Sequence, residues 1–267
     1  MNVPVITSSA SSRSMEEIAE AMGNKPRWFQ LYWSKDDDVT ASMLKRAEQA
    51  GYSAIVVTLD TTMLSWREAD LENAYLPFLQ GVGIANYITD PAFRSKLKKM
   101  PEEDMSEAIQ YFLRIFSNAS LTWKDLAFIR KNTKLPILLK GILHPKDAEL
   151  AIEHGIDGII VSNHGGRQVG GAISALDALV NISETTKDRI LLLMDSGIRR
   201  GSDIIKALAL GAKAVLLGRP YVYGLAVAGE KGVKQVIRNL LADFDLTMAL
   251  SGIKSVSEIE RSFLIQR

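Results

Sequence analysis

A short pattern that occurs three times constrains the fold of this chain more than any other feature. In each copy an alanine is followed by a glycine four positions later, by an alanine or glycine three positions after that, and then by an aliphatic run. The copies begin at Ala47, Ala151 and Ala207. Each one is typical of a helix that ends at a glycine with positive φ, followed by a turn and a buried strand. The repeat therefore predicts helices that alternate with strands of a parallel sheet.

Apolar runs of the same kind give seven candidate strands, and helical sequence follows six of them. The candidates are Val3–Thr7, Trp28–Tyr32, Ala54–Leu59, Pro136–Lys140, Gly158–Ser162, Ile190–Met194 and Ala214–Leu217. Eight βα units close a TIM barrel. We therefore predict an α/β fold, a TIM (β/α)8-type barrel in which the first unit, expected before Val3, is missing. The 267 residues form one predicted domain, because a single barrel of this length is common.

Capping signals place several helices. Ser14-x-x-Glu17 is a capping box, Pro145 suits a first helical turn, and Ser202 can cap a helix over Asp203–Leu210. Further helices are predicted at Glu102–Phe116, Trp123–Asn132, Val233–Leu250 and Ser257–Leu264.

The longest interval between strands, from Asp60 to Leu135, holds more than one crossover. It predicts a lid-like insertion at about residues 72–120, with Tyr75–Asp90 irregular and mobile. A peripheral insertion that only packs on the barrel is the alternative.

Composition excludes several classes of function. Thirty-two Lys and Arg balance 31 Asp and Glu, so no charge excess suggests nucleic acid or an anionic membrane as the partner. The absence of cysteine excludes disulfides, thiolate metal sites and thiol nucleophiles. No apolar run is long enough to span a membrane, and we expect a cytoplasmic location.

Polar side chains stand at the ends of the apolar runs, where a parallel barrel builds its active site. They are Gln30 and Tyr32, Thr58 and Asp60, Lys140, Ser162, Asn163 and His164, Asp195, Gly218 and Arg219. Lys140 can stabilise developing negative charge, or it can extend to solvent. The loops Asp195–Gly201 and Gly218–Pro220 combine glycines with arginines, as phosphate sites do, although glycine turns with surface arginines would look the same.

The segment Ser162–Gln168 carries the sharpest signal. It puts an imidazole, His164, three residues before a guanidinium, Arg167, on a glycine-rich loop. This arrangement suits a general base beside a carboxylate clamp. His144 is predicted to begin a helix and His154 to lie near a helix end, so no histidine cluster with metal spacing remains and we predict no metal site.

Taken together, Leu138–Gly141, Ser162–Gln168, Asp195–Gly201 and Gly218–Pro220 resemble the FMN-dependent 2-hydroxy acid oxidising enzymes, such as glycolate oxidase and lactate oxidase. The resemblance runs from about Ser8 to Arg261. Within that family, the segments Asn86–Pro91, Gly165–Gln168 and Asp195–Gly197 are most similar to the lactate 2-monooxygenase branch.

The resemblance implies FMN as cofactor, a small L-2-hydroxy acid as substrate, with L-lactate first, and oxygen as electron acceptor. It implies that His164 accepts the substrate proton, that Asp60 orients His164, that Arg67 and Arg167 clamp the carboxylate, and that Tyr32 hydrogen-bonds the substrate. Lys140 would stand against the N1/C2-carbonyl edge of the flavin. The remaining implied cofactor-binding residues are Ser8, Gln30, Thr58, Ser162, Asp195, Ser196, Gly197, Arg199, Gly218 and Arg219.

The family also implies a leader with an active-site tyrosine and a first strand that contacts the flavin, and this chain opens at what resembles the second strand. Two other functions therefore stay open. One is a phosphate-binding barrel with isomerase or lyase chemistry and no redox cofactor, and the other is a catalytically silent remnant. The resemblance implies a tetramer. It does not decide between a keto acid product and its decarboxylated form.

Overall fold

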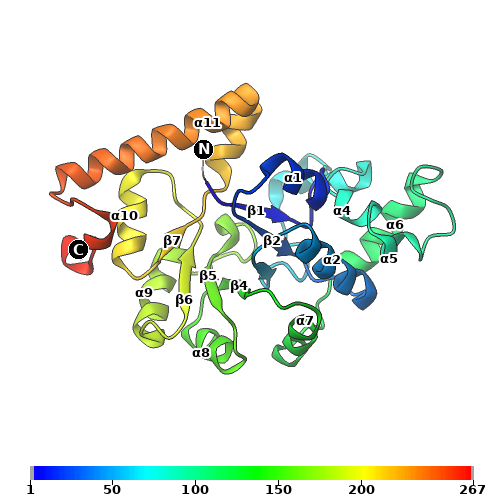
Figure 1. Ribbon diagram of the computed structural model, residues 1–267, viewed down its shortest axis with the longest axis horizontal. Coiled ribbons are helices and arrows are strands. Elements are labelled where there is room, and N and C mark those ends of the chain that lie inside the picture. Colours follow the sequence, from blue (N-terminus) through cyan, green and yellow to red (C-terminus); the bar gives the residue numbers. More distant parts are fainter. Residues whose placement is uncertain (1–2, 266–267) are drawn as a thin grey trace. The chain divides into compact units, whose positions relative to one another are not determined.

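The computed structural model describes residues 3–265 and divides into two compact units, Asn2–Lys140 and Gly141–Arg267, whose elements are labelled in Figure 1. The first contains β1 (Val5–Ser8), α1 (Met15–Met22), β2 (Arg27–Leu31), α2 (Asp37–Gln49), β3 (Ile55–Thr58), α3 (Glu68–Glu72), η1 (Pro77–Gln80), α4 (Ala85–Ile88), α5 (Pro91–Arg94), α6 (Met105–Phe116), η2 (Trp123–Asp125), α7 (Leu126–Asn132) and most of β4 (Ile137–Ile142). The second contains α8 (Pro145–Glu153), β5 (Gly158–Val161), η3 (His164–Gly166), α9 (Ala175–Thr186), β6 (Leu191–Met194), α10 (Gly201–Ala209), β7 (Ala214–Val215), α11 (Arg219–Leu250), η4 (Val256–Glu258) and η5 (Arg261–Phe263).

The strands of the first unit pair in parallel and in chain order, from β1 to β4. Their register puts Ser8 opposite Gln30, and Thr58 opposite Lys140. The four residues of β3 are all buried, as expected for an aliphatic strand covered on both faces. All seven predicted strands are found in the described part of the chain, most of them one or two residues shorter than predicted. The alternation of parallel strands and helices confirms the predicted class, a TIM-type barrel fold with seven strands in residues 3–265.

Capping residues begin the first two helices. The Ser14 hydroxyl accepts a hydrogen bond from the Glu17 amide, and the Glu17 carboxylate accepts one from the Ser14 amide, which completes the predicted capping box. In α2, the Asp36 carboxylate accepts from the Val39 amide. These interactions satisfy amides that would otherwise lack a partner at a helix start.

The insertion between β3 and β4 has two parts of different character. Residues 63–82 expose large apolar side chains, among them Trp66 at 83%. Residues 84–93 are instead largely buried, and Tyr87 and Phe93 pack edge to face with ring centroids 5.8 Å apart. Burial raises the pKa of Tyr87 above its usual range, so the phenol stays protonated. The prediction of an irregular Tyr75–Asp90 is wrong in its second half, because α4 and its buried aromatic contacts order that segment.

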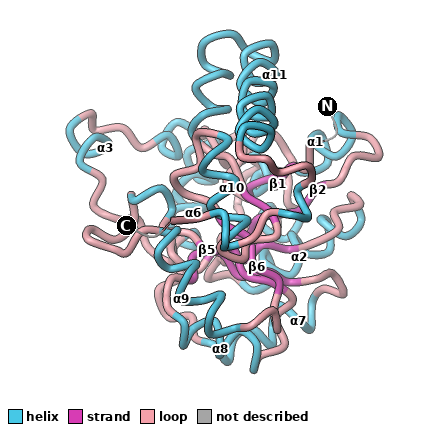
Figure 2. The backbone as a smooth tube through the Cα atoms, turned by 90° about the vertical axis from the view of Figure 1, so that its left-hand side faces the viewer, coloured by secondary structure: helices cyan, strands magenta, loops and turns pink. Residues whose placement is uncertain are grey.

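The second unit contains parallel strands β5, β6 and β7 in chain order. Figure 2 shows β5 and β6 on the inside, with α8, α9 and α10 around them. Helix α11 folds back on itself at Ala228 and Gly229, where the backbone leaves the helical region. The two arms approach closely, because a Cβ on Gly232 would lie 1.9 Å from the Gly224 carbonyl oxygen.

Two helix predictions in this unit are wrong. Helix α10 begins at Gly201 rather than Asp203, because the amides at its start have carboxylate partners. Those of Arg199 and Arg200 donate to Asp203, and that of Gly201 donates to Asp243 on α11. The predicted helix Ser257–Leu264 is replaced by η4 and η5. Side chains compete for the backbone there, since the Glu258 carboxylate accepts from the Lys254 amide. The predicted Val233–Leu250 helix is confirmed as the second arm of α11.

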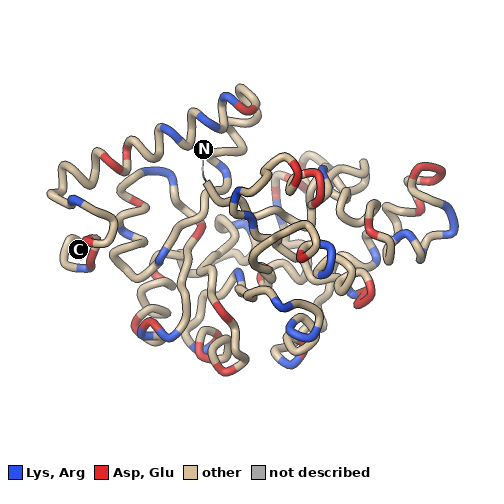
Figure 3. Tube along the Cα trace, viewed as in Figure 1, with Lys and Arg blue, Asp and Glu red and all other residues tan. Residues whose placement is uncertain are grey.

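Charged residues of both signs are interspersed along both units (Figure 3). Among residues 3–265, no helix combines the length and the apolar character needed to cross a bilayer.

A buried ion pair ties the insertion to α2, and we predict that it stabilises the first unit. Arg46 donates to Asp90 at 2.9 Å, with 10% and 0% of the two side chains exposed. Replacing Arg46 by Met should lower the free energy of unfolding by about 3–5 kcal/mol, because the Asp90 charge stays buried without its partner. Urea denaturation measures this. Arg13→Met, which removes the exposed pair with Glu17, should change it by about 0–1 kcal/mol. Equal effects of both variants would contradict the prediction.

Candidate active site

Three polar side chains at the ends of neighbouring strands form a hydrogen-bonded chain in the first unit. The Ser8 hydroxyl donates to Gln30 Oε1 at 2.6 Å, and Gln30 Nε2 donates to Thr58 Oγ1 at 2.7 Å. Gln30 and Thr58 are buried, so each side chain fixes the rotamer of the next. Lys140, half-buried, follows on β4 in register with Thr58. The structure thus brings four of the predicted cofactor-binding residues to one edge of this sheet.

Tyr32, Asp60 and Arg67 lie just beyond the strands of the same unit. The Tyr32 amide donates to Ser9 Oγ at 2.9 Å, and its ring packs edge to face on Phe116 at 5.5 Å. Asp60 Oδ1 accepts from the Thr61 hydroxyl at 3.2 Å. Arg67 precedes α3, and its Nε donates to Ser65 Oγ at 3.2 Å. Tyr32 and Asp60 therefore lie at strand ends, and Arg67 lies farther along the chain, where Ser65 and Asp70 are its partners.

In the second unit, the loops after β5 and β6 each hold a non-glycine residue in the left-handed region, as does the turn after α9 at Lys187 and Asp188. His164 has φ +57° and Ser196 has φ +72°. The loops are joined directly, because the Gly165 amide donates to Ser196 Oγ at 2.9 Å, and Ser196 Oγ donates to Asp195 Oδ1 at 2.8 Å. The His164 amide donates to the hydroxyl of buried Ser162. Such backbone costs about 1–3 kcal/mol per residue, and it clusters at functional sites.

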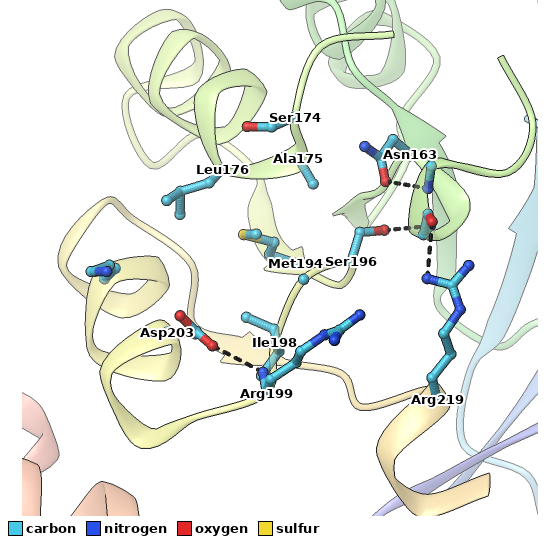
Figure 4. A pocket seen from close by; sticks show the side chains of 14 residues that line it. Asn163, Ser174, Ala175, Leu176, Met194, Ser196, Ile198, Arg199, Asp203 and Arg219 are labelled. Carbon is cyan, nitrogen blue, oxygen red and sulfur yellow. Dashed lines mark hydrogen bonds between the residues drawn. The ribbon is translucent and has the colours of Figure 1, made fainter. Parts of the chain in front are cut away.

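A pocket of about 400 Å³ lies against these loops within the second unit (Figure 4). The predicted residues Ser196, Gly197, Arg199 and Arg219 line it. Figure 4 shows Arg219 reaching up to the loop after β5, where its guanidinium donates to the Gly165 carbonyl at 3.0 Å. Asp195, Gly218, Ser162 and His164 stand in the same unit but are not among the residues that line this pocket.

The pocket fits a phosphate-bearing group such as that of FMN. A Cβ at Gly197 would meet no atom within 4 Å, so its backbone faces open space. Three cationic side chains, Arg199, Arg219 and Lys206, surround that space. The one carboxylate in the lining, Asp203, accepts from the backbone amides of Arg199 and Arg200, which offsets its charge.

Sequence reasoning places Asn163 at a strand end without a role, and it misses Ser174, Asp203 and Lys206 as lining residues. Asn163 has a signal, since it lies within the segment Ser162–Gln168 and its Oδ1 accepts from the Gly166 amide at 3.0 Å. Lys206 has no sequence signal, because it lies in the second turn of α10 rather than at a strand end. Arg167 is exposed on its loop.

Replacing Gly197 by Ala should weaken FMN binding, because the added methyl group would occupy space in the pocket. This effect adds to the strain of an alanine with positive φ. Gly155→Ala is a matched control, since Gly155 also has positive φ and open surroundings but does not line the pocket. Both variants should lose about 1–2 kcal/mol of stability from the left-handed backbone. Quenching of FMN fluorescence should show weaker binding only for Gly197→Ala. Equal FMN affinities in the two variants would contradict the placement of the phosphate.

Comparisons with known proteins identify the family of this chain. An L-lactate oxidase of Lysinibacillus sphaericus is 46% identical over 266 residues, which cover 100% of this chain and 68% of the relative. An FMN-dependent alpha-hydroxy acid dehydrogenase of Schizosaccharomyces pombe is 49% identical over 96% of this chain and 65% of its own. A crystal structure of mandelate oxidase superposes with a TM-score of 0.81 at 39% identity, over 97% of this chain and 69% of its own. The chain thus spans about two thirds of the length of these relatives. The sequence profile of the FMN-dependent dehydrogenases matches residues 1–266, and the chain belongs to that family of flavin oxidoreductases.

Proposed function

We propose that this chain catalyses the FMN-dependent oxidation of a small L-2-hydroxy acid, with L-lactate as first candidate and oxygen as electron acceptor. The product is the 2-keto acid or its decarboxylated form. The observation that carries the proposal is the similarity of this whole chain to 68% of an L-lactate oxidase, together with the strained loop that holds His164. An imidazole on a rigid loop beside an arginine is what removal of a proton from a carboxylate-bearing substrate requires.

In this proposal His164 accepts the proton that the substrate releases, and Asp60 orients the ring and stabilises the imidazolium. A fixed imidazole needs no reorganisation when the proton moves. Support comes from the backbone around His164, which the Ser162 hydroxyl and the Ser196 side chain hold from two sides.

Arg67 and Arg167 clamp the substrate carboxylate, and Tyr32 donates a hydrogen bond to the substrate. Guanidinium groups match a carboxylate with two parallel hydrogen bonds and so fix its orientation. Tyr32 is suited to this role because Ser9 and Phe116 restrict its backbone and ring.

Bound FMN would accept the two electrons that the hydroxy acid releases on oxidation. Ser8, Gln30, Thr58 and Ser162 contact its ring system, and Lys140 stabilises negative charge on its pyrimidine edge. Asp195, Ser196, Gly197, Arg199, Gly218 and Arg219 hold the ribityl chain and the phosphate. The hydrogen-bonded chain Ser8–Gln30–Thr58 supports the first set, and the cationic pocket supports the second.

The insertion at about residues 72–120 serves as a lid over the site in this proposal. Its support is the contrast between the exposed apolar side chains of residues 63–82 and the buried segment that follows. A lid excludes water and keeps the product in the site, which decides between the two products.

Replacing His164 by Ala should slow substrate reduction of bound FMN by about 100- to 10,000-fold, because general-base catalysis contributes that much. Anaerobic stopped-flow absorbance measures the rate, and fluorescence quenching should show unchanged FMN affinity. His144→Ala is the control, since His144 only caps α8. Parallel loss of FMN binding and reduction would assign His164 a structural role.

Replacing Arg67 or Arg167 by Met should chiefly raise KM for L-lactate. Each charge-assisted hydrogen bond lost is worth about 1.5–3 kcal/mol, which corresponds to roughly 10- to 100-fold. Steady-state oxygen consumption measures KM, with Arg13→Met as an exposed control. An unchanged KM in both variants would refute the clamp.

A further inference from the structure

The segment Asn86–Pro91 stands out in the sequence but has no role in the proposed reaction. It forms most of α4 and the start of α5, within the insertion of the first unit. Three of its side chains, Asn86, Tyr87 and Asp90, have no exposed surface. Figure 1 shows α4 beside α1, next to the loop that follows β1. A polar side chain as deeply buried as Asn86 needs hydrogen-bond partners, and these identify its role.

The Asn86 amide bridges the end of β1 and the start of α1. Its Oδ1 accepts from the Met15 amide at 2.8 Å, and its Nδ2 donates to the Ser8 carbonyl at 3.1 Å and the Ser9 carbonyl at 3.3 Å. Met15 is the first residue of α1, where a helix amide lacks a partner of its own. Both ends of the side-chain amide are therefore used.

The two carbonyls belong to residues that position the proposed site. The Ser8 hydroxyl begins the hydrogen-bonded chain through Gln30 to Thr58. The Ser9 hydroxyl accepts from the Tyr32 amide. The N–H groups of the same two peptides donate to the Gln30 carbonyl and to Ser8 Oγ. The Asn86 amide holds their carbonyl side, so it contributes to the orientation of both serines.

Further contacts hold α4 in place without the Asn86 side chain. The Ala85 amide donates to the Ser11 carbonyl at 2.9 Å, and the Gly83 amide donates to Ser12 Oγ at 3.1 Å. Arg46 binds both the Asn86 carbonyl and the Asp90 carboxylate. Residues 83–90 are thus fastened to the loop Ser8–Ser12, unlike the exposed residues 63–82.

We propose that Asn86 is a positioning residue for the flavin-contacting end of β1, through the bridge of its side-chain amide to the Ser8 and Ser9 carbonyls and the Met15 amide. This inference rests on the proposed function, because the flavin that β1 would contact belongs to that function. It separates a fixed clasp, residues 83–90, from the exposed residues 63–82 that precede it, whose part from residue 72 on lies within the proposed lid.

Hydrogen exchange on the flavin-free wild-type protein gives the first test. The amides of Ser9, Ala10 and Met15 should show the same protection factor as those of residues 84–90, because they open as one unit. Exchange of residues 84–90 that is at least tenfold faster than that of Ser8–Ser12 would overturn the proposal. This comparison needs no variant to fold.

Asn86→Asp provides the second test, since Asp keeps the acceptor for Met15 and, at pH 8, lacks the donor for Ser8 and Ser9. It should speed exchange of Ser8–Ser12 and weaken FMN binding at least tenfold, measured by fluorescence quenching. Asn86→Ala should do the same, and Ser12→Ala, which removes a neighbouring contact of the clasp, should stay within twofold of wild type. Far-UV circular dichroism checks that each variant is folded.

The outcomes separate this inference from the proposed function. Unchanged exchange and unchanged FMN affinity in folded Asn86→Asp would overturn the positioning role. Failure of the wild-type chain to bind FMN would instead count against the proposed function, and the exchange data alone would then decide the role of Asn86.

Discussion

Parallel strand pairing is the constraint on which the rest of this structure depends. Parallel neighbours must all end at the same edge of their sheet, so side chains distant in sequence meet there. In the first unit this constraint brings Ser8, Gln30 and Thr58 into one hydrogen-bonded chain. In the second it brings the loops after β5 and β6 together through the Gly165 amide and Ser196. The chemistry of each unit is built on these strand ends.

The fold was predictable where the signal is local. Aliphatic runs marked every strand, and the capping box of Ser14 and Glu17 marked the start of α1, because both depend on neighbours within a few residues. The start of α10 was not predictable. The amide of its first residue, Gly201, donates to the carboxylate of Asp243, which lies far along the chain on α11. The fold-back of α11 was not predictable either, because it depends on the tertiary contact between Gly224 and Gly232.

The residues of the candidate site also fall into two groups, those with a local sequence signal and those without one. Spacing located Gln30, Lys140, His164 and Asp195 at strand ends, and the family resemblance supplied their proposed roles. Spacing cannot locate Lys206, which reaches the phosphate pocket from a helix, nor the contacts of Asn86, which crosses from the insertion to β1. Residues that act by bridging elements leave no periodic signal, and only the three-dimensional contacts identify them.

The chain belongs to the FMN-dependent dehydrogenases. The reaction that we propose for it removes two protons and two electrons from a 2-hydroxy acid, and His164 is the proposed acceptor of one of the protons. The most direct measurement is the visible absorption spectrum of the protein after reconstitution with FMN and anaerobic addition of L-lactate. Our account predicts that bound oxidised flavin loses its visible absorption band when L-lactate is added. Bound flavin that stays oxidised with L-lactate and with other small L-2-hydroxy acids would contradict it.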